Sequence, residues 1–143
     1  MDRARKRERG SAAVEFALVM TPLLLLALGG IDFGNYFYLS EVIANAAREG
    51  ARAGAIVPDA AINPPAANLA ATNAAQNYLT TVGLTGAATI TTTPNCVVVI
   101  GGGNPPAPAV CIQIAYPAGS ITGFLAAVMP ANATAQAVMR LEP

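Results

Sequence analysis

Glu15 is the residue whose chemistry most needs an explanation, because it is a carboxylate inside an apolar stretch that runs from Ser11 to Ile31. An unpaired charge in a membrane-spanning segment costs free energy, so an acidic group there is a candidate for a functional role. The alternative is that Glu15 lies near the membrane interface, where its side chain reaches water or takes up a proton. Its position alone leaves both interpretations open.

Cys96 and Cys111 are the other residues with reactive side chains. They flank a Gly- and Pro-rich loop, residues 101–108, that we expect to be mobile. In an oxidising compartment two such cysteines predict one disulfide bond, with two unpaired buried thiols as the alternative. Their spacing is not CxxC, and the chain has no His to complete a Cys–His couple or a zinc set. We therefore expect no catalytic residue, no cofactor and no metal site.

The apolar stretch is long enough to cross a membrane once. A helix rises about 1.5 Å per residue and a bilayer core is about 30 Å thick, so residues 11–31 suffice. Basic flanks are enriched on the cytoplasmic side of a span, which predicts a cytoplasmic N-terminus and an exported C-terminal domain. A secretory signal with an apolar core from Val14 to Leu28 is the competing interpretation. Five of the eight basic residues precede the stretch: Arg3, Arg5, Lys6, Arg7 and Arg9.

The helical pattern continues beyond the apolar stretch to about Ala55. A helix from Ser11 to Ala55 would measure about 67 Å, more than twice the bilayer core, so its second half stands outside the lipid. Pro22 predicts a kink rather than a break. The small residues from Gly50 to Ala55 favour close packing within the chain. One helix face carries Leu39, Ile43, Ala46, Gly50 and Gly54, and the opposite face carries Glu41, Asn45, Arg48 and Arg52.

The rest of the chain predicts one small domain. Asn63 and Pro64 can start a second helix that ends before Gly83. From Ala88 the apolar period changes to two, which predicts an antiparallel sheet with strands over residues 89–93, 96–100, 110–116 and 133–141. The fold class is therefore α+β. We divide the chain into a basic cytoplasmic leader, a transmembrane segment, a periplasmic extension of the helix, and a helix-plus-sheet periplasmic domain, at residues 1–10, 11–31, 32–57 and 58–143.

The sequence from Gly10 to Phe16, after a basic leader and before an apolar helix, resembles the processing site of type IV prepilin-like proteins. With the run NAAREGARAGA that follows, it resembles the TadE-like family of tight-adherence (Flp) pilus assembly proteins, over residues 7–57 and more loosely at the final strand. The resemblance implies that a prepilin peptidase cuts between Gly10 and Ser11. It also implies an assembly role for Glu15 and Phe16. Ser11 is equally suited to cap the helix.

The resemblance implies a non-enzymatic minor pseudopilin of the bacterial cytoplasmic membrane. Its partners would be the membrane, other pilus or pseudopilin subunits, the assembly machinery and a prepilin peptidase, with no nucleic acid. The alternative is a permanently anchored single-span envelope scaffold that does not enter a filament. An anchored hydrolase is disfavoured, because the chain has no His and only Asp59 and Glu142 are acidic after Glu49.

Overall fold

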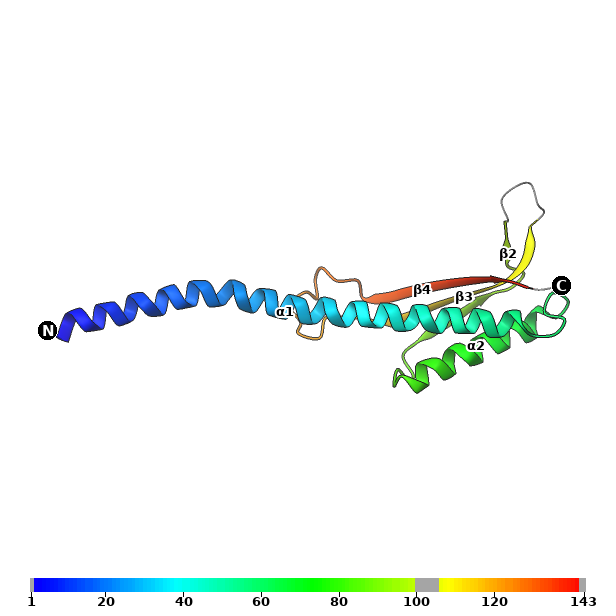
Figure 1. Cartoon of the computed structure of the whole chain (residues 1–143), viewed down its shortest axis with the longest axis horizontal. Helices are drawn as coiled ribbons and strands as arrows, with labels where there is room; N and C mark the ends of the chain where they lie inside the picture. The colour runs from blue at the N-terminus through cyan, green and yellow to red at the C-terminus, as the bar shows by residue number, and fades with distance from the viewer. Residues whose placement is uncertain (1, 100–105, 142–143) are drawn as a thin grey trace.

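One long helix, α1 (Asp2–Ala55), forms the axis of the molecule (Figure 1). The computed structural model describes residues 2–99 and 106–141. At about 1.5 Å per residue, the 54 residues of α1 extend for about 81 Å. The helix continues through Pro22, so the proline does not break it. It ends at Ala55, where the sequence predicted its end.

The start of α1 differs from the prediction. The helix begins at Asp2 and not at Ser11, which therefore lies inside the helix and cannot be its N-cap. Residues 2–9 are rich in Arg, Lys, Glu and Ala, which have high helix propensity, and they contain no Pro or Gly to stop the helix from propagating.

The second helix, α2 (Pro64–Thr81), packs against the second half of α1. The two helices approach closely where α1 has Gly50 and Gly54, since a Cβ placed on either glycine would lie 2.7 Å from a backbone oxygen of α2. The expected apolar stripe of α1 is confirmed, because its five residues are all buried. The residues that α2 buries against it are Ala67, Ala71, Ala75 and Leu79.

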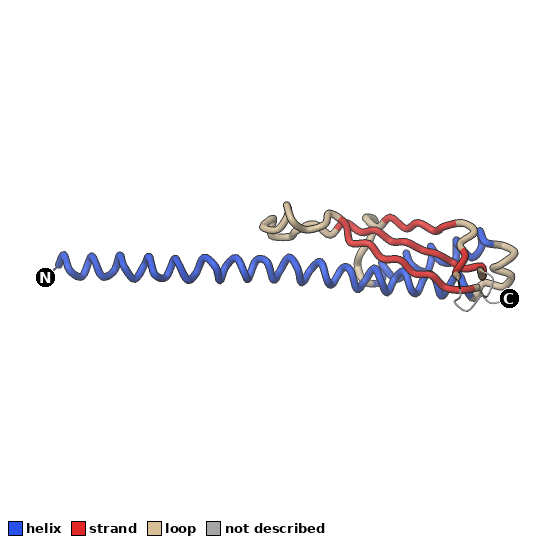
Figure 2. Tube along the Cα trace, turned by 90° about the horizontal axis from the view of Figure 1, so that it is seen from above, coloured by secondary structure: helices blue, strands red, loops and turns tan. Residues whose placement is uncertain are grey.

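The four strands are β1 (Thr89–Thr93), β2 (Val97–Val98), β3 (Ala107–Pro117) and β4 (Asn132–Arg140). They form the predicted antiparallel sheet, in which β3 is central and pairs with the other three. Figure 2 shows the strands running along the distal half of α1. Both helices contact the sheet, and the core between them includes Ile43, Val110, Ile112, Ile114 and Ala133. The α+β fold class is confirmed.

The bounds of three strands differ from the predicted ones, and those of β4 differ by only one residue at each end. β2 covers only Val97–Val98, so Cys96 and Val99, which the predicted strand included, lie outside it. β3 begins at Ala107, so Ala107 and Pro108 belong to a strand and not to the expected mobile loop. Residues 101–105 of that loop, and residue 100 at the end of the predicted strand over 96–100, lie outside the described residues.

Cys96 and Cys111 are joined by a disulfide bond, with their Cα atoms 5.9 Å apart. Cys96 directly precedes β2 and Cys111 lies within β3, opposite Thr93 of β1. The backbone N–H of Ala109 also donates to the carbonyl oxygen of Cys96, at 2.8 Å. The bond therefore ties the turn between β1 and β2 to the central strand.

Replacing both cysteines with Ser, in the double variant Cys96→Ser/Cys111→Ser, should lower the free energy of unfolding by about 3 kcal/mol. The reason is that the bond closes a loop of about 15 residues. Denaturant titration would measure the loss. In unreduced, exported wild-type protein, a thiol-alkylating reagent should label neither cysteine after denaturation, and it should label both after reduction. Labelling of both without reduction would contradict the pairing.

Candidate processing and assembly site

The candidate processing and assembly residues lie on the first third of α1. Gly10 and Ser11 are helical in backbone conformation. Ser11 and Glu15 are one helical turn apart, and the Ser11 hydroxyl donates to Oε1 of Glu15 at 3.3 Å. Phe16 is 64% exposed. Ser11, Glu15 and Phe16 thus lie on an open helical surface.

The apolar side chains that follow are also uncovered by the rest of the molecule. The span from Ser11 to Ala55 contains a window of mean hydropathy 2.1, none of it buried, and it is the one helix among the described residues that is long and apolar enough to cross a membrane. Exposed leucines in this window include Leu18, Leu23, Leu24, Leu25 and Leu26. An uncovered apolar surface of this size needs lipid or other apolar helices around it.

The charged residues on the distal part of α1 form a solvated face. Arg52 makes an ion pair with Glu49 at 2.8 Å, and Arg48 donates to the side-chain oxygen of Asn45 at 2.6 Å. Both members of the ion pair are well exposed, so it contributes well under 1 kcal/mol. The packing expected of Gly50–Ala55 is confirmed, but it comes from the small residues and not from these charges.

Asp32 is a buried carboxylate that the sequence analysis missed. It is fully buried, on α1, directly after the predicted span. Four donors from the connection between β3 and β4 reach it: Ser120 Oγ at 2.5 Å, Thr122 Oγ1 at 2.7 Å, and the backbone N–H groups of Thr122 at 2.9 Å and Leu125 at 3.3 Å. A carboxylate that accepts four hydrogen bonds is well compensated for its burial. Asp32 therefore fastens this connection to α1.

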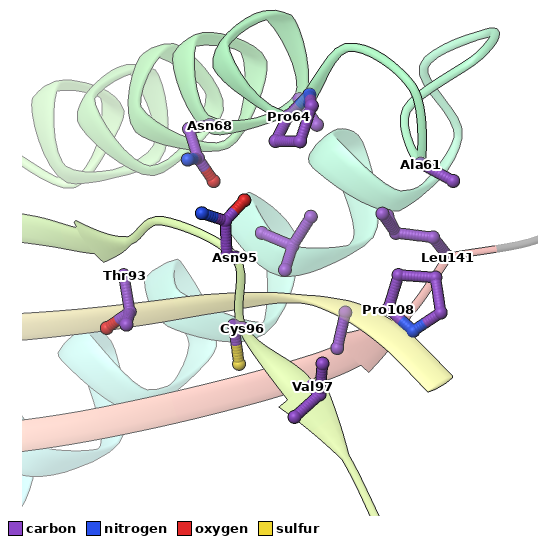
Figure 3. A pocket seen from close by; sticks show the side chains of 12 residues that line it. Ala61, Pro64, Asn68, Thr93, Asn95, Cys96, Val97, Pro108 and Leu141 are labelled. Carbon is purple, nitrogen blue, oxygen red and sulfur yellow. The ribbon is translucent and has the colours of Figure 1, made fainter. Parts of the chain in front are cut away.

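A small cavity lies between α2 and the sheet (Figure 3). Its volume is about 200 Å³, and its polar lining consists of the amides of Asn68 and Asn95 and the hydroxyl of Thr93. Cys96, which also lines it, is in the disulfide bond. No carboxylate, amine or guanidinium lines this cavity, and the described residues contain no cluster of three His, Cys, Asp or Glu side chains that could hold a metal ion.

Comparison with known protein families gives one match, and the matched residues all lie in α1. A family model described as "TadE-like protein" matches residues 10–52. No curated protein and no solved structure matches the chain. The match contains Gly10, Ser11, Glu15 and Phe16, whose individual roles it does not test, and the looser resemblance at the final strand lies outside it. Residues 10–52 are thus similar to the TadE-like family, a non-catalytic kind of protein involved in tight-adherence pilus assembly.

Proposed function

We propose that this chain is a non-enzymatic minor pseudopilin of a tight-adherence pilus assembly system. The observation that carries the proposal is that the TadE-like match covers both halves of one helix, whose first half is apolar and uncovered and whose second half forms the core of a small domain. A filament subunit needs both parts: an apolar helix to pack with its neighbours and a folded domain held outside the bundle.

The orientation in this proposal follows from the basic leader, residues 1–10, which we place in the cytoplasm. Residues 11–31 would then cross the cytoplasmic membrane, and the domain would lie in the periplasm or outside the cell. The asymmetry of charge supports this direction, because basic flanks resist translocation.

Protease added to intact spheroplasts should therefore digest the chain beyond about residue 60 and leave the N-terminal segment protected. Antibodies to tags at each end would follow the two parts, and a cytoplasmic protein would serve as the control for leakage. Digestion of the N-terminal tag with protection of the domain would contradict the orientation.

Glu15 has a specific role in the proposed mechanism. Cleavage after Gly10 would leave a positively charged amine on Ser11. The carboxylate of Glu15 in one subunit would attract the amine of a neighbouring subunit, and such a pair counts for more in the low-dielectric membrane than in water. The present contact between Ser11 Oγ and Glu15 Oε1, at 3.3 Å, supports this role by placing the two residues on the same helical face.

A permanently anchored envelope scaffold is the alternative, and it would use the same helix and domain without leaving the membrane. Shearing pili from the cells and fractionating them separates the two functions. A pseudopilin should appear in the sheared filaments and in the membrane, whereas a scaffold should stay in the membrane fraction alone.

A further inference from the structure

The connection between β3 and β4, residues 118–131, extends beyond the sheet and runs beside α1 toward its N-terminus (Figures 1 and 2). We call it the β3–β4 loop. Leu125 lies beside Gly29 of α1, since its Cδ1 is 4.0 Å from the point where a Cβ would lie if that glycine had a side chain. Gly29 is inside the segment expected to cross the membrane. The loop therefore lies at the level where α1 enters the lipid.

Several polar groups of this loop are turned inward or paired within it. Ser120 and Thr122 donate their hydroxyl groups to Asp32. The N–H groups of Val128 and Met129 donate to the carbonyl oxygen of Leu125, both at 2.9 Å. The loop contains no Asp, Glu, Lys or Arg. Irregular backbone survives in an apolar medium only when its polar groups are satisfied internally, and much of this loop meets that condition.

The outward side chains of the loop are apolar. Val128 is 79% exposed, Ile121 is 65% exposed and Phe124 is 45% exposed. The loop that carries them contacts α1 at Gly29 and Asp32. Both positions are on the membrane side of a cluster of aromatic residues that interact with one another, Phe33, Tyr36 and Phe37. Aromatic side chains gather at membrane interfaces, so this cluster marks the level of the headgroups and the loop lies at or below it.

We propose that the β3–β4 loop is a membrane-inserted loop that seats the domain on the lipid surface, with Asp32 holding it in that position. The inference rests on the proposed membrane anchoring of α1. The partner is the lipid bilayer itself, because the loop offers an uncharged, outwardly apolar surface that is continuous with the span. Burial of this surface in the interface would fix the distance and tilt of the domain above the membrane.

The chain has no Trp, so a single introduced Trp reports its surroundings without background. We would reconstitute full-length Val128→Trp in vesicles of phosphatidylethanolamine and phosphatidylglycerol that contain phospholipids brominated near the headgroup end of the acyl chains. Its fluorescence should be blue-shifted and quenched by the brominated lipid. Phe124→Trp, which keeps an aromatic ring, should behave in the same way.

Ile62→Trp is the matched control, because Ile62 is an 84% exposed apolar residue in the turn between α1 and α2, at the far end of the domain. It should show neither effect. Leu24→Trp, in the span, tests the anchoring separately. If Leu24→Trp is quenched but the two loop variants behave like Ile62→Trp, the loop proposal alone is overturned. If Leu24→Trp is not quenched, both the anchoring and the loop proposal fail.

A second copy of the chain could shield the same surface. In that case the loop variants would be blue-shifted but not quenched by brominated lipid, and the shift would disappear as the protein is diluted in lipid. That result would also overturn the proposal. Quenching that is independent of the protein-to-lipid ratio is the result expected for a loop seated in the bilayer.

Discussion

Replacing Gly54 or Gly50 with Ala should destabilise the domain more than any other substitution of similar size on α1. A Cβ at Gly54 would lie 2.7 Å from the carbonyl oxygen of Ala67, and a Cβ at Gly50 would lie 2.7 Å from that of Ala71. These oxygens belong to the backbone of α2 and cannot rotate away, so the helices must move apart. Side chains of the sheet crowd the same two positions. The Cβ at Gly50 would lie 2.9 Å from Ile112, and the Cβ at Gly54 would lie 3.1 Å from Val110.

Overpacking of this kind costs about 1–3 kcal/mol for each site, and the gain in helix propensity when Gly becomes Ala is about 1 kcal/mol, so the net loss reaches about 2 kcal/mol for each site. A small domain with a total stability of about 5–15 kcal/mol would lose a large part of it in the Gly50→Ala/Gly54→Ala pair. Thermal unfolding of the purified protein in detergent, followed by circular dichroism, would measure the loss.

Gly34→Ala is the matched control, because it is the same change on the same helix at a position with no other atom within 4 Å of the new Cβ. It should leave the unfolding temperature unchanged or raise it slightly. If Gly50→Ala and Gly54→Ala unfold at the temperature of Gly34→Ala, the close contact between α1 and α2 is wrong.

Gly10→Val and Glu15→Ala should both stop pilus assembly, but at different stages. A branched side chain at position 10 would occupy the place where a peptidase approaches the backbone, so Gly10→Val should accumulate as a full-length precursor in the membrane. Glu15→Ala should insert as well as the wild type or better, because it removes the cost of placing a carboxylate in the lipid. It should be cleaved normally and then fail to enter filaments.

Immunoblots of the membrane and of sheared pili would distinguish the two stages. Glu41→Ala is the control for loss of a carboxylate, since Glu41 is exposed on α1 beyond the predicted span. Normal pili from the Glu15→Ala strain would contradict the proposed pairing with the Ser11 amine of a neighbour, and would favour the anchored scaffold.

The sequence predicted the parts of the fold that depend on local patterns. The α1 stripe of Leu39, Ile43 and Ala46 repeats with the helical period, and this pattern continues to about Ala55, so both the buried face and the end of the helix could be predicted from the sequence. The alternation from Val110 to Tyr116 likewise predicted the buried centre of β3. These features need no knowledge of what lies opposite them.

The parts that could not be predicted depend on partners far away in the sequence. Asp32 is held by Ser120 and Thr122, which lie 88 and 90 residues further along the chain, and its only local signal is an acidic residue at the end of an apolar run. The start of α1 was predicted too late, because residues 2–9 were interpreted from their charge as a leader and their high helix propensity was not considered.

The most direct test of the pseudopilin account is the intact mass of the chain recovered from sheared pili, compared with that from the membrane fraction of the same cells. We expect the filament form to begin at Ser11, lighter than the sequence from Met1 by the ten leader residues. Gly10→Val should show only the uncleaved mass, and only in the membrane. The contradicting result is a wild-type chain that is absent from the filaments and that still carries its leader, complete or without Met1. That result would favour the permanently anchored scaffold.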